Sequence, residues 1–194
     1  MLVVIVTIHE WAHAKAADTL GDPTPEMEGR LTLDPRSHLD PLGSLMFLLA
    51  GFGWGKPVPF DAYNLKNPVR DAALIAFAGP LSNALMAIGA SFLLFLARSA
   101  GESTIGMLGQ TLLPLFISLN IRLGIFNLLP FGPLDGFKVV GGLLPRAQAR
   151  DWYALERYGL YFLLFFLLPF AGDRSMMDIF IIPVVDFLMK VLVG

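Results

Sequence analysis

Long apolar stretches alternate along this chain with short segments rich in proline, glycine and charged residues. A helix that crosses a membrane needs about 20 mostly apolar residues. Residues 72–97 contain no charged residue and predict one such span. Residues 1–20 are also long enough, although their second half is polar. The polar residues of that half are His9, Glu10, His13, Lys15 and Asp18.

Three later stretches are further candidate spans. Residues 104–134 are long and apolar but are interrupted by three prolines and by Arg122. Residues 152–171 and 176–193 are apolar runs that each carry a few charged residues. The linkers between the spans contain the turn-forming residues proline and glycine, above all in residues 21–41.

Residues 42–55 are too short for an ordinary span but have the length of a re-entrant or interfacial segment. Their four glycines favour a hairpin or a broken helix. A short straight span is the alternative. We therefore expect an all-α membrane protein, a polytopic helical bundle of four to six spans, with a re-entrant β-hairpin or loop near residues 42–60. Residues 1–194 are expected to form a single domain.

The composition supports a membrane protein. The chain has 194 residues, of which 55% are hydrophobic and 15% charged, whereas soluble domains have roughly 45–50% and about 25%. The mean hydropathy is +0.64. The net charge of −2 and the lack of a basic block give no sign of a nucleic-acid partner. Cysteine is absent, so any metal must be held by imidazole and carboxylate groups. We expect a multi-pass protein of the cell membrane, with the lipid bilayer as its surroundings.

The polar residues near the start include the motif His9-Glu10-Trp11-Ala12-His13. Two histidines four residues apart lie on one face of a helix, as two nitrogen ligands of a tetrahedral zinc require. Glu10 could then act as general base on water activated by the metal, and later donate a proton to the leaving amine. The alternative is a chance match on an amphipathic helix. Ionisable groups in a membrane segment cost about 2.5–3.5 kcal/mol each, which favours a functional role.

A catalytic zinc usually has three protein ligands and a water. The third ligand must be His38, an aspartate or a glutamate, and Asp135 is the strongest candidate. It follows an apolar stretch whose prolines and glycines would unwind a helix at membrane depth, where broken backbone must be buried in protein or line a cavity. A turn or capping aspartate that faces water is the alternative interpretation of Asp135. His38 itself is expected to be a loop histidine at an interface.

Three ordered blocks resemble the site-2 protease family of intramembrane zinc metalloproteases, in its short bacterial and archaeal form. They are His9-Glu-Trp-Ala-His13, Ala78-Gly-Pro-Leu-Ser-Asn83, and Asn127-Leu-Leu-Pro-Phe-Gly-Pro-Leu-Asp135-Gly136. The segments Gly29-Arg-Leu-Thr-Leu-Asp-Pro35 and Lys56-Pro-Val-Pro59 are similar to the family as well. The resemblance covers at least residues 1–140.

The resemblance implies a role for each matched residue. His9, His13 and Asp135 would bind Zn²⁺, and Glu10 would be the catalytic base and acid. Asn127 would be a second catalytic residue, which orients the substrate or stabilises the oxyanion through its amide. The substrates would be single-pass membrane proteins, cut within their transmembrane segments. Gly79-Pro80 would interrupt the 72–97 helix near the site. Asn83 would lie there too, although hydrogen bonding between helices explains it equally well.

Two positions depart from the family. Arg122 stands where an apolar residue is expected, and either reaches an interface or pairs with an acid such as Glu10 or Asp135. The Phe131-Gly132-Pro133 segment replaces a more proline-rich version. The oligomeric state is not predicted. The early position of the motif leaves two interpretations open, a shortened first helix or a missing upstream segment.

Two other functions compete with this one. A membrane metallopeptidase of another family would take a glutamate as its third ligand, and only Glu102 and Glu156 lie downstream of Glu28. A non-proteolytic membrane protein, either a transporter or a pseudoprotease that acts as a binding module, is the second alternative. The intact Glu10 and ligand positions favour an active enzyme.

Overall fold

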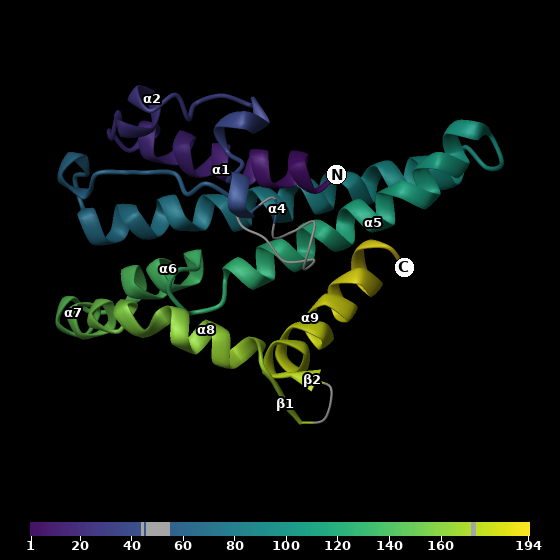
Figure 1. The fold of residues 1–194 in the computed structure, drawn as a ribbon. Coiled ribbons are helices and arrows are strands. Elements are labelled where there is room, and N and C mark those ends of the chain that lie inside the picture. Colours follow the sequence, from purple (N-terminus) through teal and green to yellow (C-terminus); the bar gives the residue numbers. More distant parts are fainter. Residues whose placement is uncertain (44, 46–54, 172–173) are drawn as a thin grey trace.

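The computed structural model describes residues 1–194 except 44, 46–54 and 172–173. It is helical apart from a short antiparallel strand pair (Figure 1). The helices are α1 (Leu2–Thr19), α2 (Thr24–Met27), α4 (Pro68–Ser99), α5 (Thr104–Asn127), α6 (Asp135–Leu143), α7 (Arg146–Ala154), α8 (Gly159–Leu167) and α9 (Met176–Leu192). The 3₁₀ turns are η1 (Pro35–Ser37), η2 (Ala62–Asn64) and η3 (Glu156–Tyr158), and the strands are β1 (Pro169–Ala171) and β2 (Arg174–Ser175).

The two longest helices, α4 and α5, form a hairpin at the centre of the fold (Figure 1). Pro68 begins α4, where its missing N–H costs nothing. The turn at its end contains Gly101 at φ +58°, and the hydroxyl of Ser103 accepts a hydrogen bond from the N–H of Gly106 to cap α5. Among the described residues, these two helices are long and apolar enough to cross a membrane.

Two expectations about helix boundaries were wrong. Gly79-Pro80 does not interrupt the 72–97 span, because α4 runs through both residues as one helix. Residues 152–171 do not form one span: they are divided among α7, η3, α8 and β1. That run is apolar, but the α8 part is only 9 residues long. The predicted break after Asn127 is confirmed, since α5 ends there and α6 begins at Asp135.

The predicted spans at 1–20 and 176–193 correspond to helices α1 and α9, of 18 and 17 residues. The expected hairpin near 42–60 falls largely on residues outside the described part of the chain. Of its flanks, Leu39 and Gly55 form an antiparallel bridge, and the N–H of Lys56 donates to the carbonyl of His38 at 2.8 Å. The two sides of this segment therefore lie next to each other.

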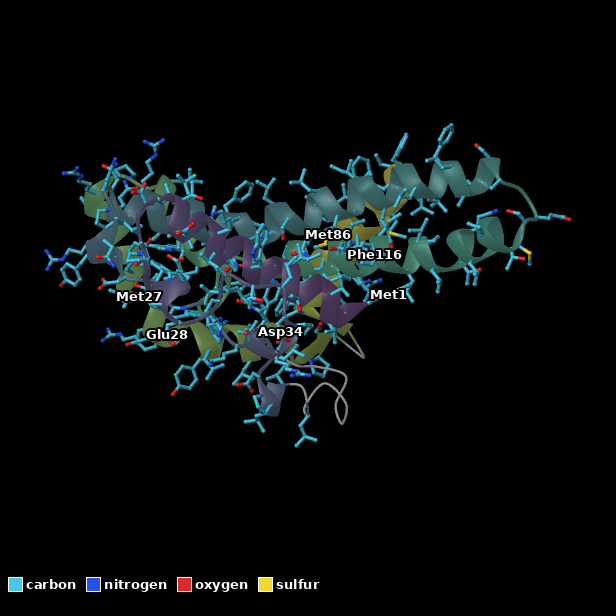
Figure 2. All side chains as sticks on the ribbon, turned by 90° about the horizontal axis from the view of Figure 1, so that it is seen from above. Met1, Met27, Glu28, Asp34, Met86 and Phe116 are labelled. Atoms are coloured by element: carbon cyan, nitrogen blue, oxygen red, sulfur yellow. The ribbon has the colours of Figure 1, made fainter. Side chains whose placement is uncertain are left out.

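The main core lies where α4, α5 and α9 meet. Its small residues, Ala87 and Ala90, let the helices approach closely. The other buried members are Leu94, Ile117, Ile121, Ile181 and Val185. The outer faces of the hairpin are apolar as well, and Figure 2 shows mostly hydrocarbon side chains on it beyond Met86 and Phe116. Exposed residues there include Ile88, Phe92, Phe95 and Leu108. Apolar side chains on both the inner and outer faces suit a helix pair surrounded by lipid.

Asp22 fixes the end of α1 to the loop before α4. Its carboxylate is fully buried and accepts hydrogen bonds from the backbone N–H and the hydroxyl of Thr24, at 3.1 and 2.6 Å. It also accepts from the N–H of Asp61 at 2.7 Å and from the amide of Asn64 at 2.8 Å. Burial alone would raise the pKa of Asp22, but these hydrogen bonds to the charged form outweigh it and lower the pKa.

We predict that Asp22→Asn destabilises the protein by about 2 kcal/mol at pH 7, because an amide cannot accept all four hydrogen bonds. The folded pKa of Asp22 lies below its unfolded value of about 3.9, so its stabilisation is complete above that value and is lost as the pH falls through the folded pKa. Unfolding of the detergent-solubilised protein should show the gap between wild type and Asp22→Asn shrinking below pH ~4. A gap that is the same at pH 7 and pH 3 would contradict this.

Candidate metal centre and active site

Helix α1 carries the two histidines of the motif on the face that packs against α4. One turn of helix separates them, so both rings point the same way. Their side chains are buried, with 4% and 7% of His9 and His13 exposed. The two Nε2 atoms are 3.1 Å apart. The spacing predicted from the motif is therefore present in the fold.

Asp135 completes a group of three at this point. The chain leaves helical geometry after Asn127, and α6 begins with Asp135 itself. Its Oδ2 atom lies 3.2 Å from Nε2 of His9 and 3.3 Å from Nε2 of His13. In the described part of the chain, these three residues form the one group of histidine and acidic side chains close enough to share a metal ion, with ligand atoms within 4.8 Å of one another.

The other ring nitrogens of the histidines contact α4. Nδ1 of His13 donates to the carbonyl of Ile75 at 2.7 Å, since a carbonyl can only accept. Nδ1 of His9 is 2.6 Å from Oδ1 of Asn83. A partner on Nδ1 fixes both the orientation of an imidazole and the nitrogen that carries its proton. Helix α4 therefore aims both Nε2 atoms at Asp135.

Gly79 makes the close packing of α1 on α4 possible. A Cβ atom added to Gly79 would lie 2.4 Å from Nε2 of His13 and 2.6 Å from Cε1 of His9. Real side chains essentially never make such contacts, so any larger residue here must displace the rings. The glycine of the Ala78–Asn83 block is thus part of the site because of the space that it leaves.

Glu10 lies beside the three converging residues, next to the segment at Gly55. A Cβ on Gly55 would lie 3.1 Å from Oε1 of Glu10 and 3.3 Å from the carbonyl of His38. The carboxylate of Glu10 thus borders both the histidines of its own helix and the extended backbone at residues 55–56. That position lets it serve a reacting group near Asp135 without being one of the three convergent ligand atoms.

Arg30 is a buried residue near the site to which the sequence analysis assigned no role. Only 2% of it is exposed, and its Nη2 donates to the carbonyl of Lys56. Within the described residues, its Nε and Nη1 have no hydrogen-bond partner. Burial lowers the pKa of Arg30, while the negative charges of Glu10 and Glu28 act in the opposite direction. Arg30 therefore anchors the extended segment that borders Glu10.

Asn127 does not join the group in this structure. It is the last residue of α5, and its amide donates to the carbonyl of Leu123 in its own helix at 3.1 Å. Arg122 is exposed, and its Nε lies 3.3 Å from the hydroxyl of Ser118. In the described part of the chain, no ion pair links Arg122 to Glu10 or Asp135, which leaves the expected pairing without support.

His38 lies in a loop, as expected, and is buried there, while its place at an interface stays a prediction. It has no exposed surface, and its Nε2 lies 2.7 Å from the carbonyl of Thr32. It lies outside the group formed by His9, His13 and Asp135. One ring nitrogen of His38 is used within the 32–38 loop, and among the described residues the fold offers no support for His38 as the third metal ligand.

Comparisons with known proteins identify the family. The family model of peptidase family M50 matches residues 99–170, which include Asn127 and Asp135. YwhC of Bacillus subtilis (strain 168), named as a zinc metalloprotease, is 40% identical over 88% of this chain and 80% of its own length. Rip2 of Mycobacterium tuberculosis (strain ATCC 25618 / H37Rv), also named as a zinc metalloprotease, is 31% identical over 86% of this chain and 65% of its own length. No solved structure matches the chain.

These similarities decide between the functions that the sequence left open. A relative that is 40% identical over most of both chains favours the protease over a transporter-like protein or a metallopeptidase of another family. The helical fold, the apolar hairpin and the converging histidine and aspartate side chains are consistent with that family. The chain belongs to peptidase family M50, the site-2 protease family, and is a zinc metalloprotease that acts on membrane proteins within the bilayer.

Proposed function

We propose that His9, His13 and Asp135 bind the catalytic zinc of this protease. The observation that carries the proposal is the convergence of two Nε2 atoms and one carboxylate oxygen at 3.1–3.3 Å. Nδ1 of His13 already donates elsewhere, so its neutral ring presents a lone pair. Oδ2 of Asp135 is buried without a conventional hydrogen-bond donor among the described residues. A cation between these three lone-pair atoms would satisfy all of them. Two imidazoles and one carboxylate form a set of ligands that suits zinc.

Glu10 acts as general base and acid in this proposal. When bound, zinc supplies Lewis acidity, which polarises the peptide carbonyl and acidifies water. The Glu10 carboxylate takes the proton from the attacking water and returns it to the leaving amine nitrogen. Its place next to Gly55, outside the ligand group, supports this role because the carboxylate is not needed as a ligand.

Asn127 provides an amide donor for the substrate carbonyl. In this structure its Nδ2 donates to the carbonyl of Leu123, so the role requires that contact to be exchanged for a substrate oxygen. Its position supports the role, since it ends α5 where the broken backbone leads to Asp135. An amide donor in a dry site stabilises the negative charge that develops on the oxygen.

The membrane arrangement is also part of the proposal. Helices α1 and α9 join α4 and α5 as spans, which makes a multi-pass protein of the cell membrane with residues 1–194 as one domain. The packing of α4 against α1, α5 and α6 supports a single unit. The substrates are single-pass membrane proteins. A re-entrant segment near residues 42–60 is part of the proposal, and the bridge between its flanking residues Leu39 and Gly55 supports it.

Zinc content and cleavage should respond differently to substitution of the base and of the third ligand. We expect Glu10→Gln to retain zinc while cleavage of a transmembrane reporter falls by about 10²–10⁴-fold. We expect Asp135→Ala to lose both its zinc and its cleavage activity, because two imidazoles alone hold the metal weakly. Zinc measured on the purified protein, together with reporter cleavage in proteoliposomes, checks both results.

The exposed residues Glu26 and Asp151 offer matched controls. Glu26→Gln and Asp151→Ala make the same chemical changes away from the site and should leave zinc and cleavage unchanged. Equal cleavage by wild type and Glu10→Gln would end the proposed role of Glu10. A full complement of zinc in Asp135→Ala would move the third ligand to another residue.

Substitution of Gly79 should affect the metal through packing alone. We predict that Gly79→Ala lowers zinc affinity at least ~10-fold, because the added methyl group displaces the imidazoles that hold the metal. Gly89→Ala is the matched control in the same helix, since a Cβ there has nothing within 4 Å. Competition with a zinc chelator measures both. Equal affinities for the two variants would show that the rings move aside without loss.

A further inference from the structure

A buried line of hydrogen bonds runs from His9 through α4 into the backbone of α5. Nδ1 of His9 lies 2.6 Å from Oδ1 of Asn83. Nδ2 of Asn83 donates to Oδ1 of Asn120 at 3.1 Å, and Nδ2 of Asn120 donates to the carbonyl of Phe116 at 2.9 Å. Both asparagines have no exposed surface. The line therefore links three helices out of reach of water.

The direction of every bond in this line follows from its last member. The backbone carbonyl of Phe116 can only accept. Asn120 must turn its NH₂ group toward that carbonyl, which leaves its oxygen facing Asn83. Asn83 must then donate its own NH₂ group and present its oxygen to His9. A flip of either amide would place two oxygens or two NH₂ groups against each other in a buried site.

The line therefore decides which nitrogen of His9 carries the proton. An oxygen at 2.6 Å requires a hydrogen on Nδ1, so the neutral ring keeps its lone pair on Nε2. That lone pair faces His13 and Asp135. His13 reaches an acceptor-only carbonyl directly, at Ile75. His9 reaches one only through two side-chain amides, whose orientation must be held.

We propose that Asn120 is a positioning residue of the zinc site. Acting through Asn83, it holds His9 in the tautomer that presents Nε2 to the metal. The inference rests on the proposed role of His9 as a zinc ligand. A purely structural role is the competing explanation, because an asparagine pair between α4 and α5 would also join the helices. The two roles differ in whether the orientation of the Asn83 amide matters.

Two backgrounds separate these roles. In the wild-type background, Asn120→Leu frees the Asn83 amide to rotate, and we expect zinc affinity to fall about 10–100-fold. In a chain that also carries Asn83→Asp, the same Asn120→Leu change should have no further effect on zinc affinity. A carboxylate accepts the proton of His9 through either oxygen and needs no partner to orient it. A structural role of Asn120 would lower the affinity in both backgrounds.

Two controls isolate the effect. Ile117→Ala opens a gap in the same core of α5 but removes no side-chain hydrogen bond of the line, so it should lower the unfolding temperature but not zinc affinity. Asn120→Asp, protonated in this buried site, still donates to the carbonyl of Phe116 and keeps an acceptor facing Asn83. Its zinc affinity should stay within about 3-fold of wild type, well short of the loss expected when such a partner is removed. This variant also tests the proposal if Asn120→Leu does not fold.

The measurement is chelator competition on the full, detergent-solubilised protein, with thermal unfolding of each apo variant alongside it. Loss of affinity in Asn120→Leu that disappears in the Asn83→Asp background supports the proposal. Any of three results would overturn it. They are a wild-type zinc affinity in Asn120→Leu, an equal loss of zinc affinity in both backgrounds, and an Asn120→Asp zinc affinity as low as that of Asn120→Leu. His9→Ala tests the underlying ligand assignment separately, because retention of zinc by that variant would overturn the proposed metal centre itself.

Discussion

Three acceptor atoms facing one another in a buried space form the constraint on which the rest of this structure depends. Nε2 of His9, Nε2 of His13 and Oδ2 of Asp135 are separated by only 3.1–3.3 Å. Lone pairs at that distance repel one another unless a proton or a metal ion lies between them. In a zinc protease the metal ion fills that role, and the surrounding helices must keep the three groups in place without help from water.

The surrounding helices supply the needed contacts by different means. Gly79 leaves the space that lets the rings of α1 lie directly on α4. The carbonyl of Ile75 orients His13, while Asn83 orients His9 and is itself oriented from α5. Gly124 of α5 has a similar function, because a Cβ there would lie 3.3 Å from the Cβ of Asn83. Glycines and asparagines at helix contacts are thus as much a part of the metal centre as the proposed ligands.

The proposed ligands were predictable from the sequence, whereas most of their supports were not. His9 and His13 follow from helical spacing, and Asp135 follows from the cost of a carboxylate in an apolar, proline-broken stretch. Asn120 lies 37 residues from Asn83 and belongs to no recognisable motif. The carbonyl of Ile75 carries no sequence signal, because every residue has one. Arg30 lies in a segment that resembles the family, yet only the fold reveals its burial beside residues 55–56.

Helix boundaries show the same limits. Pro80 was expected to break α4, but helix packing on several sides keeps the helix continuous through it. Residues 152–171 are apolar enough for a span, yet the chain turns within them, because composition does not determine where a helix ends. The break between Asn127 and Asp135 was predictable because prolines and glycines are concentrated there.

X-ray absorption at the zinc edge of the purified wild-type protein tests the proposed metal centre most directly. We predict nearest neighbours that are nitrogen and oxygen only, at about 2.0–2.2 Å, with the outer scattering of two imidazole rings. In Asp135→Ala, any zinc that remains should lose one oxygen neighbour and keep both imidazoles. A wild-type spectrum with one imidazole, or with three, would contradict the assignment of His9, His13 and Asp135.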